Sequence, residues 1–96
     1  MSDFKEVRAA HILVPTKEEA DNIKSGIESG KIAFEEAAVE FSMCPSGARG
    51  GDLGYFGKGM MVKEFEDAAF NGEVDKVTEP VKTQFGWHLI KVVDKK

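Results

Sequence analysis

The chain has 96 residues, 42% hydrophobic and 31% charged, which is enough to bury one core and too little for two domains of ordinary size. Its net charge of −4 argues against a general nucleic-acid binder, and no apolar run approaches the length of a membrane span or a secretory signal. One cysteine cannot form an internal disulfide, so we expect a cytoplasmic protein with a single domain over 1–96 and a core over about 7–93.

A strand is predicted over Val7–Val14, because apolar residues occupy both of its faces as they do in a central strand. Alternation divides its side chains into two sets: Val7, Ala9, His11 and Leu13 on one face, and Ala10, Ile12 and Val14 on the other. Pro15 ends the strand because it has no amide hydrogen to donate.

Two helices are predicted next. Thr16 and Glu19 have the spacing of a capping box at the start of the first helix, and Gly30 suits its end. The second helix spans Ala33–Phe41 and has an inner face at helical spacing: Phe34, Ala37, Ala38 and Phe41. The following segment, CPSGARGGDLG, is predicted to be a loop with at most one turn of helix.

The second half of the chain predicts a short strand over Leu53–Phe56, a helix over Val62–Phe70 and a terminal hairpin. The hairpin pairs a short strand within Val77–Gln84 with a longer one over Trp87–Val93, through a tight connection at Phe85-Gly86. Helices grouped against a small antiparallel or mixed sheet predict an α+β domain.

His11 and His88 are the only histidines, and each lies inside a predicted strand among apolar residues. A buried imidazole is costly unless its ring nitrogens find hydrogen-bond partners. The simpler interpretation is a pair of structural core histidines, bonded to each other or to a hydroxyl such as that of Thr83. A functional interpretation requires the first and last strands to be neighbours, which periodicity alone does not establish.

Cys44 is the only thiol, and most free cysteines are small buried hydrophobes. A Cys–His nucleophile is conceivable, but no nucleophile motif surrounds this residue. Zinc bound by both histidines and Cys44 would lack a fourth ligand and a closely spaced ligand pair, so we expect neither metal nor cofactor. The segment GARGGDLG lacks a Walker lysine and the G-x-G-x-x-G spacing, which argues against a phosphate site.

Methionines and phenylalanines gather near the ends of the predicted elements. Met61 and Phe65 lie four residues apart and can face one point together. A methionine–aromatic surface suits an apolar ligand group. The alternative is that such residues belong to the ordinary core, an interpretation that holds equally well for Phe70.

Three segments resemble the parvulin family of peptidyl-prolyl cis/trans isomerases: AAHILV at 9–14, FSMCPSGARGGDLGYFGKGMMVKEFEDAAF at 41–70 and EPVKTQFGWHLIKV at 79–92. They occur in order and span about Val7 to Val93. The resemblance implies a parvulin-like (FKBP-like) α+β fold of order β-α3-β-α-β2, with a four-stranded antiparallel sheet wrapped by four helices. The fourth helix is then a short turn within Pro45–Gly51.

The resemblance also implies a site. His11 and His88 are expected on neighbouring strands, with Cys44 beside them and the Thr83 hydroxyl bonded into their network. The implied proline pocket consists of Met61, Phe65 and Phe85, with support from Phe70, Leu53 and Met60. Parvulins often have Asp where this chain has Cys44, so no covalent intermediate is expected.

Phosphate-selective parvulins carry a long basic loop after the first strand, whereas Pro15–Glu19 contains one lysine beside two glutamates. We therefore expect a stand-alone, monomeric isomerase without phosphate selectivity. Its expected partners are proline-containing peptides and unfolded or partly folded proteins, with no nucleic acid and no transmembrane segment. The rival interpretation is a non-catalytic peptide-binding module or holdase that uses the same groove.

Overall fold

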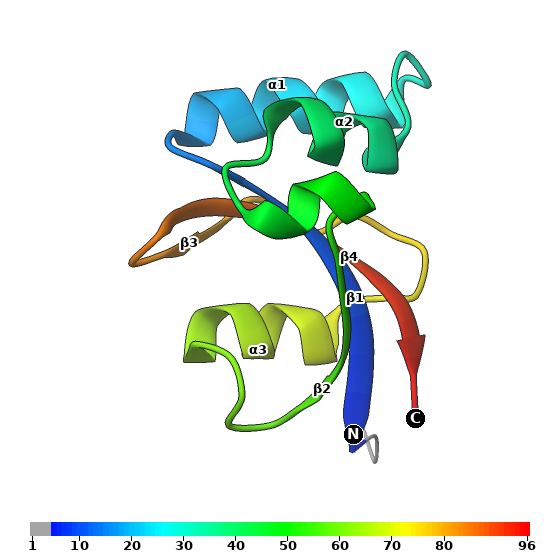
Figure 1. Ribbon diagram of the computed structural model, residues 1–96, viewed down its shortest axis with the longest axis vertical. Helices are drawn as coiled ribbons and strands as arrows, with labels where there is room; N and C mark the ends of the chain where they lie inside the picture. Colours follow the sequence, from blue (N-terminus) through cyan, green and yellow to red (C-terminus); the bar gives the residue numbers. More distant parts are fainter. Residues whose placement is uncertain (1–4) are drawn as a thin grey trace.

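Four antiparallel strands form one sheet in the order β2–β1–β4–β3 in the computed structural model, which describes residues 5–96 (Figure 1). The strands are β1 (Glu6–Val14), β2 (Asp52–Gly57), β3 (Val81–Thr83) and β4 (Gly86–Lys95). The central pair, β1 and β4, is aligned from Val7 opposite Lys95 to Val14 opposite Trp87. The expected antiparallel sheet is confirmed, and it makes the first and last strands neighbours.

Helices cover both faces of this sheet. Helices α1 (Lys17–Glu28) and α2 (Phe34–Phe41) lie together on one side, and α3 (Lys63–Asn71) lies on the other (Figure 1). A 3-10 helix, η1 (Pro45–Arg49), connects α2 to β2 and confirms the short fourth helix that the resemblance implies. Among residues 5–96, none of the helices is long and apolar enough to cross a membrane.

The alternation of β1 divides the core into two clusters. Val7 and Ala9 pack on the α3 side with Phe65, whereas Ile12 and Val14 pack on the other side with residues of α1 and α2. Full burial of one Val, Ile or Phe side chain stabilises the fold by roughly 1.5–3 kcal/mol. The predicted division of faces is therefore correct, and it directs the odd-numbered positions of β1 towards α3.

Two predictions of local structure are wrong. Thr83 pairs with Gly86, so the hairpin turn consists of Gln84 and Phe85, and Gly86 already belongs to β4. Phe41 does not join the inner face of α2, because it is the last residue of that helix and lies over a groove instead of the sheet. Its side chain is 45% exposed.

Candidate functional site

His11 and His88 lie on the α3 side of the two central strands. His11 is opposite Ile90 and Leu13 is opposite His88, so the two histidines are diagonal neighbours across the β1–β4 pair. Their Nδ1 atoms are 3.0 Å apart, and the rings are nearly parallel at 16°. Both side chains are buried. The two histidines therefore form a hydrogen-bonded pair and are not independent core residues.

Thr83 extends this pair from β3, with its Oγ1 atom 2.7 Å from Nε2 of His88. The same oxygen accepts the Phe85 N–H at 3.2 Å. The hydroxyl hydrogen has no other acceptor in the described part of the chain, so we assign it to Nε2 of His88. His88 then carries its proton on Nδ1 and donates it to Nδ1 of His11, whose own proton is on Nε2.

Burial lowers the pKa of both histidines. It brings the pKa of His11 to about 4, with repulsion from a charged His88 as the second cause. Burial alone accounts for the lower pKa of His88. Both imidazoles are therefore neutral at pH 7, in agreement with the assignment of one proton to each ring.

The fourth imidazole nitrogen, Nε2 of His11, is buried without a hydrogen-bond partner among the described residues. The Phe65 ring stands at 83° to the His11 ring and at 81° to the His88 ring, with centroids 5.4 and 5.3 Å away. An unpaired buried polar atom costs about 1–3 kcal/mol and is uncommon in folded proteins. The aromatic wall of α3 thus closes directly over the histidine pair.

An apolar pocket of about 510 Å³ opens beside the histidines. It is here called the proline pocket after the group that the family resemblance implies it holds. Its walls come from β1, the α2–η1 connection, β2, α3 and the β3–β4 turn. The lining residues are His11, Leu13, Met43, Cys44, Pro45, Leu53, Met60, Met61, Val62, Phe65, Phe85 and His88. Among these residues the only polar side chains are two neutral imidazoles and a thiol, so the pocket suits an apolar ring.

Most of the predicted site residues meet in this pocket. Eight of the ten line it: His11, Cys44, His88, Met61, Phe65, Phe85, Leu53 and Met60. Thr83 lies behind His88, to which it is bonded. Phe70 is absent from the lining and packs in the core, with its ring centroid 6.1 Å from that of Phe56.

Four lining residues were not predicted as part of the site: Leu13, Met43, Pro45 and Val62. Leu13 could have been predicted from the sequence as a lining residue, because strand alternation puts it on the same face as His11. Met43 and Pro45 flank Cys44, but their exposure to the pocket depends on the path of the α2–η1 connection, which periodicity does not predict.

The Cys44 thiol is not activated by an imidazole. Its Sγ atom accepts a hydrogen bond from Ser46 Oγ at 3.2 Å. Nδ1 of each histidine is bonded to the other, and Nε2 of His88 is bonded to Thr83. Nε2 of His11 has no hydrogen-bond partner among the described residues, Cys44 included. Within residues 5–96 there is also no group of three His, Cys, Asp or Glu side chains that could hold a metal ion. The geometry therefore lacks the thiol–imidazole contact of a cysteine nucleophile.

These features agree with the parvulin resemblance of the sequence: a buried histidine pair behind an apolar pocket, on an antiparallel sheet flanked by helices. A sequence model described as "Rotamase: PPIC-type PPIASE domain" matches residues 6–94. The chain belongs to this family of peptidyl-prolyl isomerase domains, which confirms the resemblance noted in its sequence.

Curated relatives include the foldase protein PrsA of Halalkalibacterium halodurans, which is 52% identical over 92 residues. That match covers 95% of this chain and 27% of the relative. The foldase protein PrsA of Bacillus subtilis (strain 168) is 42% identical over 94% of this chain and 31% of its own length. The chain thus spans about a third or less of these relatives.

Solved structures agree with the sequence relatives. The peptidylprolyl isomerase PrsA from Bacillus anthracis superposes with a TM-score of 0.93 at 41% identity, over 97% of this chain and 43% of that chain. The parvuline NmPin of Nitrosopumilus maritimus has a TM-score of 0.85 and 44% identity, over 97% of this chain and all of that one. The α+β parvulin fold is therefore confirmed.

Proposed function

We propose that this chain accelerates cis/trans rotation about X-Pro bonds in polypeptide clients and thereby assists their folding. The observation that carries the proposal is the apolar proline pocket over a neutral His11–His88 pair. Rotation of a peptide bond is opposed by a barrier of ~18–20 kcal/mol, and X-Pro exchange takes roughly tens to hundreds of seconds. Such exchange is slow enough to limit folding, so a catalyst has a defined task.

The proposed mechanism breaks no bond. Met61, Phe65 and Phe85 hold the proline ring by burying its methylenes, and the pocket excludes water from the adjoining amide carbonyl. A twisted amide is less polar than a planar one, so an apolar environment stabilises the transition state over both ground states. A barrier lower by about 5–6 kcal/mol corresponds to roughly ten-thousandfold acceleration.

The histidine network keeps the floor of the pocket uncharged and rigid in this mechanism. Cys44 lies near the rotating carbonyl and tunes its surroundings without a covalent bond. We expect a Cys44→Asp variant to keep substantial activity, since the thiol has no imidazole bonded to it. Isolation of a thioester or thiohemiacetal at Cys44 by mass spectrometry would contradict this role.

The primary test is NMR exchange spectroscopy on short, unphosphorylated X-Pro peptides with catalytic amounts of protein. Cis/trans exchange should accelerate, and Met61→Ala should reduce the acceleration by emptying part of the pocket. Val39→Ala is the matched control, because this exposed side chain of α2 does not line the pocket. Phe65→Ala is less informative, since truncation of a buried phenylalanine costs about 3–5 kcal/mol of stability.

The second candidate function is a peptide-binding module or holdase. It is favoured by the large exposed apolar groups at the pocket mouth, where Phe85 is 59% exposed. Peptide-induced chemical shift changes without faster exchange would support that function and contradict catalysis.

We propose further that the domain over residues 1–96 acts as a monomer in the cytoplasm. An open pocket supports the first point, because a client chain must enter it, and a single free thiol supports the second. Light scattering after size-exclusion chromatography measures the oligomeric state. Fractionation of cells that express the native gene measures the location.

A further inference from the structure

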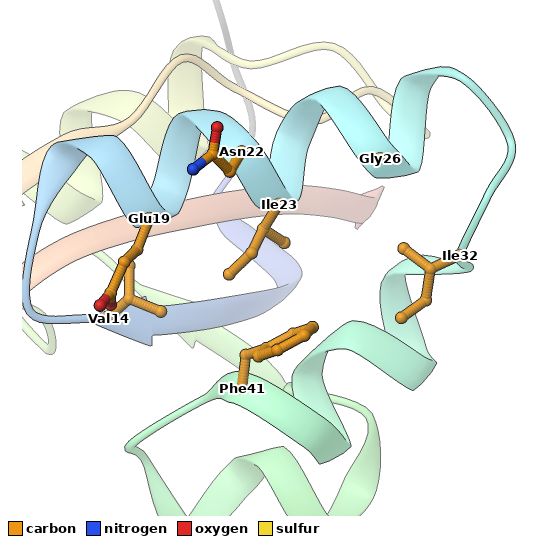
Figure 2. Close-up of a pocket in the computed structure, with 7 residues that line it drawn as sticks. All are labelled: Val14, Glu19, Asn22, Ile23, Gly26, Ile32 and Phe41. Carbon is orange, nitrogen blue, oxygen red and sulfur yellow. The ribbon is translucent and has the colours of Figure 1, made fainter.

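A second apolar groove lies between α1 and α2, on the opposite side of the sheet from α3. It has a volume of about 490 Å³ and is lined by Val14, Glu19, Asn22, Ile23, Gly26, Ile32 and Phe41. Figure 2 shows Ile23 of α1 and Phe41 of α2 extending towards each other across it. This feature, here called the helical groove, explains why a large aromatic side chain stays exposed at the end of α2.

The helical groove adjoins the proline pocket through two short stretches of backbone. In β1, Leu13 lines the pocket and Val14 lines the groove. After α2, Met43 lines the pocket, and Phe41 at the end of that helix lines the groove. The two stretches are joined directly: Met43 N–H donates to Leu13 O at 2.8 Å, and Leu13 N–H donates to Ser42 Oγ at 3.1 Å. Consecutive strand residues point to opposite faces of a sheet, so the two hollows lie on opposite sides of β1. A client chain must pass around the α2–η1 connection to reach both, and each extended residue spans at most about 3.6 Å of that path.

The helices that form this groove are strongly acidic. Helix α1 has four acidic and two basic side chains and α2 has three acidic and none basic, a charge of −5 against −4 for the whole chain. Both lysines of α1 are already paired, Lys17 with Asp21 and Lys24 with Glu28 and Glu79. Glu19 lines the groove and pairs with no cation in the described part of the chain.

We propose that the helical groove is a second client subsite, which holds an apolar side chain flanked by Lys or Arg. It binds a segment a few residues from the proline whose bond is rotated, and this role rests on the proposed isomerase function. Two linked contacts raise the affinity of a long client over that of an isolated X-Pro motif without any change in the pocket itself. Glu19 in the lining and the net negative charge of α1 and α2 select basic segments and speed their encounter.

A second copy of this chain fits the groove poorly. A two-fold interface would place each acidic pair of helices against its own copy. Like charges opposed across an interface destabilise it, which favours a basic client over self-association.

The experiment compares two kinds of peptide by chemical shift titration of ¹⁵N-labelled protein. A six-residue Leu-Pro peptide fills the pocket alone, and longer versions add Lys-Ile-Lys after a spacer of two, four or six residues. The best long peptide should bind at least about fivefold more tightly than the short one, with shifts at Phe41. Glutamate in place of both lysines should remove most of this gain.

Variants locate the effect. Phe41→Ser and Glu19→Lys should each bring the ratio of long-peptide to short-peptide affinity close to one, and Glu19→Lys should prefer the glutamate peptide. Glu19→Lys leaves the apolar packing intact, so it tests the groove even if Phe41→Ser destabilises α2. Val39→Ser is the matched control, since Val39 is an exposed residue of the same helix that does not line the groove, and it should preserve the ratio.

A ratio near one in the unaltered protein at every spacer length would overturn the proposal. An equal loss for Val39→Ser and Phe41→Ser, or concentration-dependent shifts at Phe41 without peptide, would do the same. Failure of the isomerase function has a different signature. Cis/trans exchange of the short peptide would then stay slow, while the long peptide still gained affinity through the groove.

Discussion

His11 and His88 are polar side chains buried where apolar ones would be simpler to accommodate. Their nitrogens satisfy one another and the Thr83 hydroxyl, apart from Nε2 of His11, which has no partner in the described chain. In this network of side chains, the hydrogen bond that Thr83 donates determines the tautomer of His88, and the hydrogen bond from His88 determines the tautomer of His11. A network of this kind makes the floor of the proline pocket rigid, but it depends on neutral imidazoles.

Stability should therefore depend on pH between 6.5 and 4.5. The pKa of each histidine is lower in the folded chain, so the unfolded chain binds more protons in this range. The free energy of unfolding is greatest above about pH 6.5 and falls as the pH approaches the folded pKa of His11, about 4. Over these two pH units His11 alone accounts for a loss of about 2–3 kcal/mol.

Urea unfolding at pH 7.0, 6.0, 5.0 and 4.5 measures this loss. The range stops at 4.5 because Asp52 and Asp94 also have lowered pKa values, and their contribution to stability is lost at more acidic pH. A His11→Asn variant is the control, and its unfolding free energy should change less steeply with pH. An equally steep dependence in that variant would show that His11 is not the titrating group.

Thr83 is expected to set the histidine tautomers. Thr83→Val keeps the shape of the side chain and leaves both His88 Nε2 and the Phe85 N–H without a partner, at a cost of about 1–3 kcal/mol. Long-range ¹H–¹⁵N spectra should show the His88 proton redistributed between its two nitrogens. Thr83→Ser, which retains the hydroxyl, should preserve the spectrum, and an identical change in both variants would contradict the assignment.

At the scale of elements, alternation predicts the two faces of β1 correctly, because a strand has a fixed period of two and the core is apolar on both sides. The hairpin turn was misplaced by one residue, since pairing between strands decides where a strand starts. The burial of Phe41 was also wrong, because helical periodicity gives a direction and not the extent of the surface beneath it. Tertiary packing supplies both pieces of information.

Gly51 shows how closely η1 and β2 hold the site. Its φ is +86°, it accepts the His11 N–H at 2.9 Å, and an added Cβ would lie 2.4 Å from the His11 carbonyl oxygen. The added Cβ would be fixed to the Gly51 backbone, and the His11 carbonyl oxygen belongs to the backbone of β1, so neither group can rotate away. Gly54 in β2 has a similar φ of +72° but open space around the corresponding position.

Gly51→Ala is therefore expected to be more destabilising than Gly54→Ala. The left-handed conformation costs each alanine about 1–2 kcal/mol, and steric overlap adds roughly 1–3 kcal/mol at Gly51 alone. Denaturant unfolding of the two variants measures the difference, and the imidazole resonances should move only for Gly51→Ala. Equal destabilisation would mean that the His11 backbone yields easily.

At the scale of the whole molecule, residue patterns predicted an α+β domain and the β3–β4 hairpin, but not that β1 lies beside β4. Periodicity describes each strand alone, and the contact between His11 and His88 joins positions 77 residues apart. The family resemblance supplied that contact, together with the short η1 helix. The helical groove escaped prediction altogether, since it depends on the spacing between two helices that each look like ordinary amphipathic elements.

The distribution of charge predicts the response to phosphorylated clients. The described lining of the proline pocket contains no Lys or Arg, and β1 joins α1 through Pro15 and Thr16 alone. The one lysine that follows, Lys17, is bonded to Asp21 at 2.9 Å. A phosphate on the residue before proline would meet no arranged cation there, although phosphate recognition in proteins depends on charge-assisted hydrogen bonds.

Phosphorylation of that residue should therefore bring no gain in catalysis. Matched Ser-Pro, phosphoserine-Pro, Leu-Pro and Lys-Pro peptides, compared by exchange spectroscopy at low and high salt, measure the preference. The phosphoserine peptide should react no faster than its serine counterpart, and the acidic α1–α2 pair should repel it most at low salt, where charges are least screened. A tenfold preference for phosphoserine would mean that lysines outside the pocket lining converge on the client, and that the short β1–α1 connection does not decide selectivity.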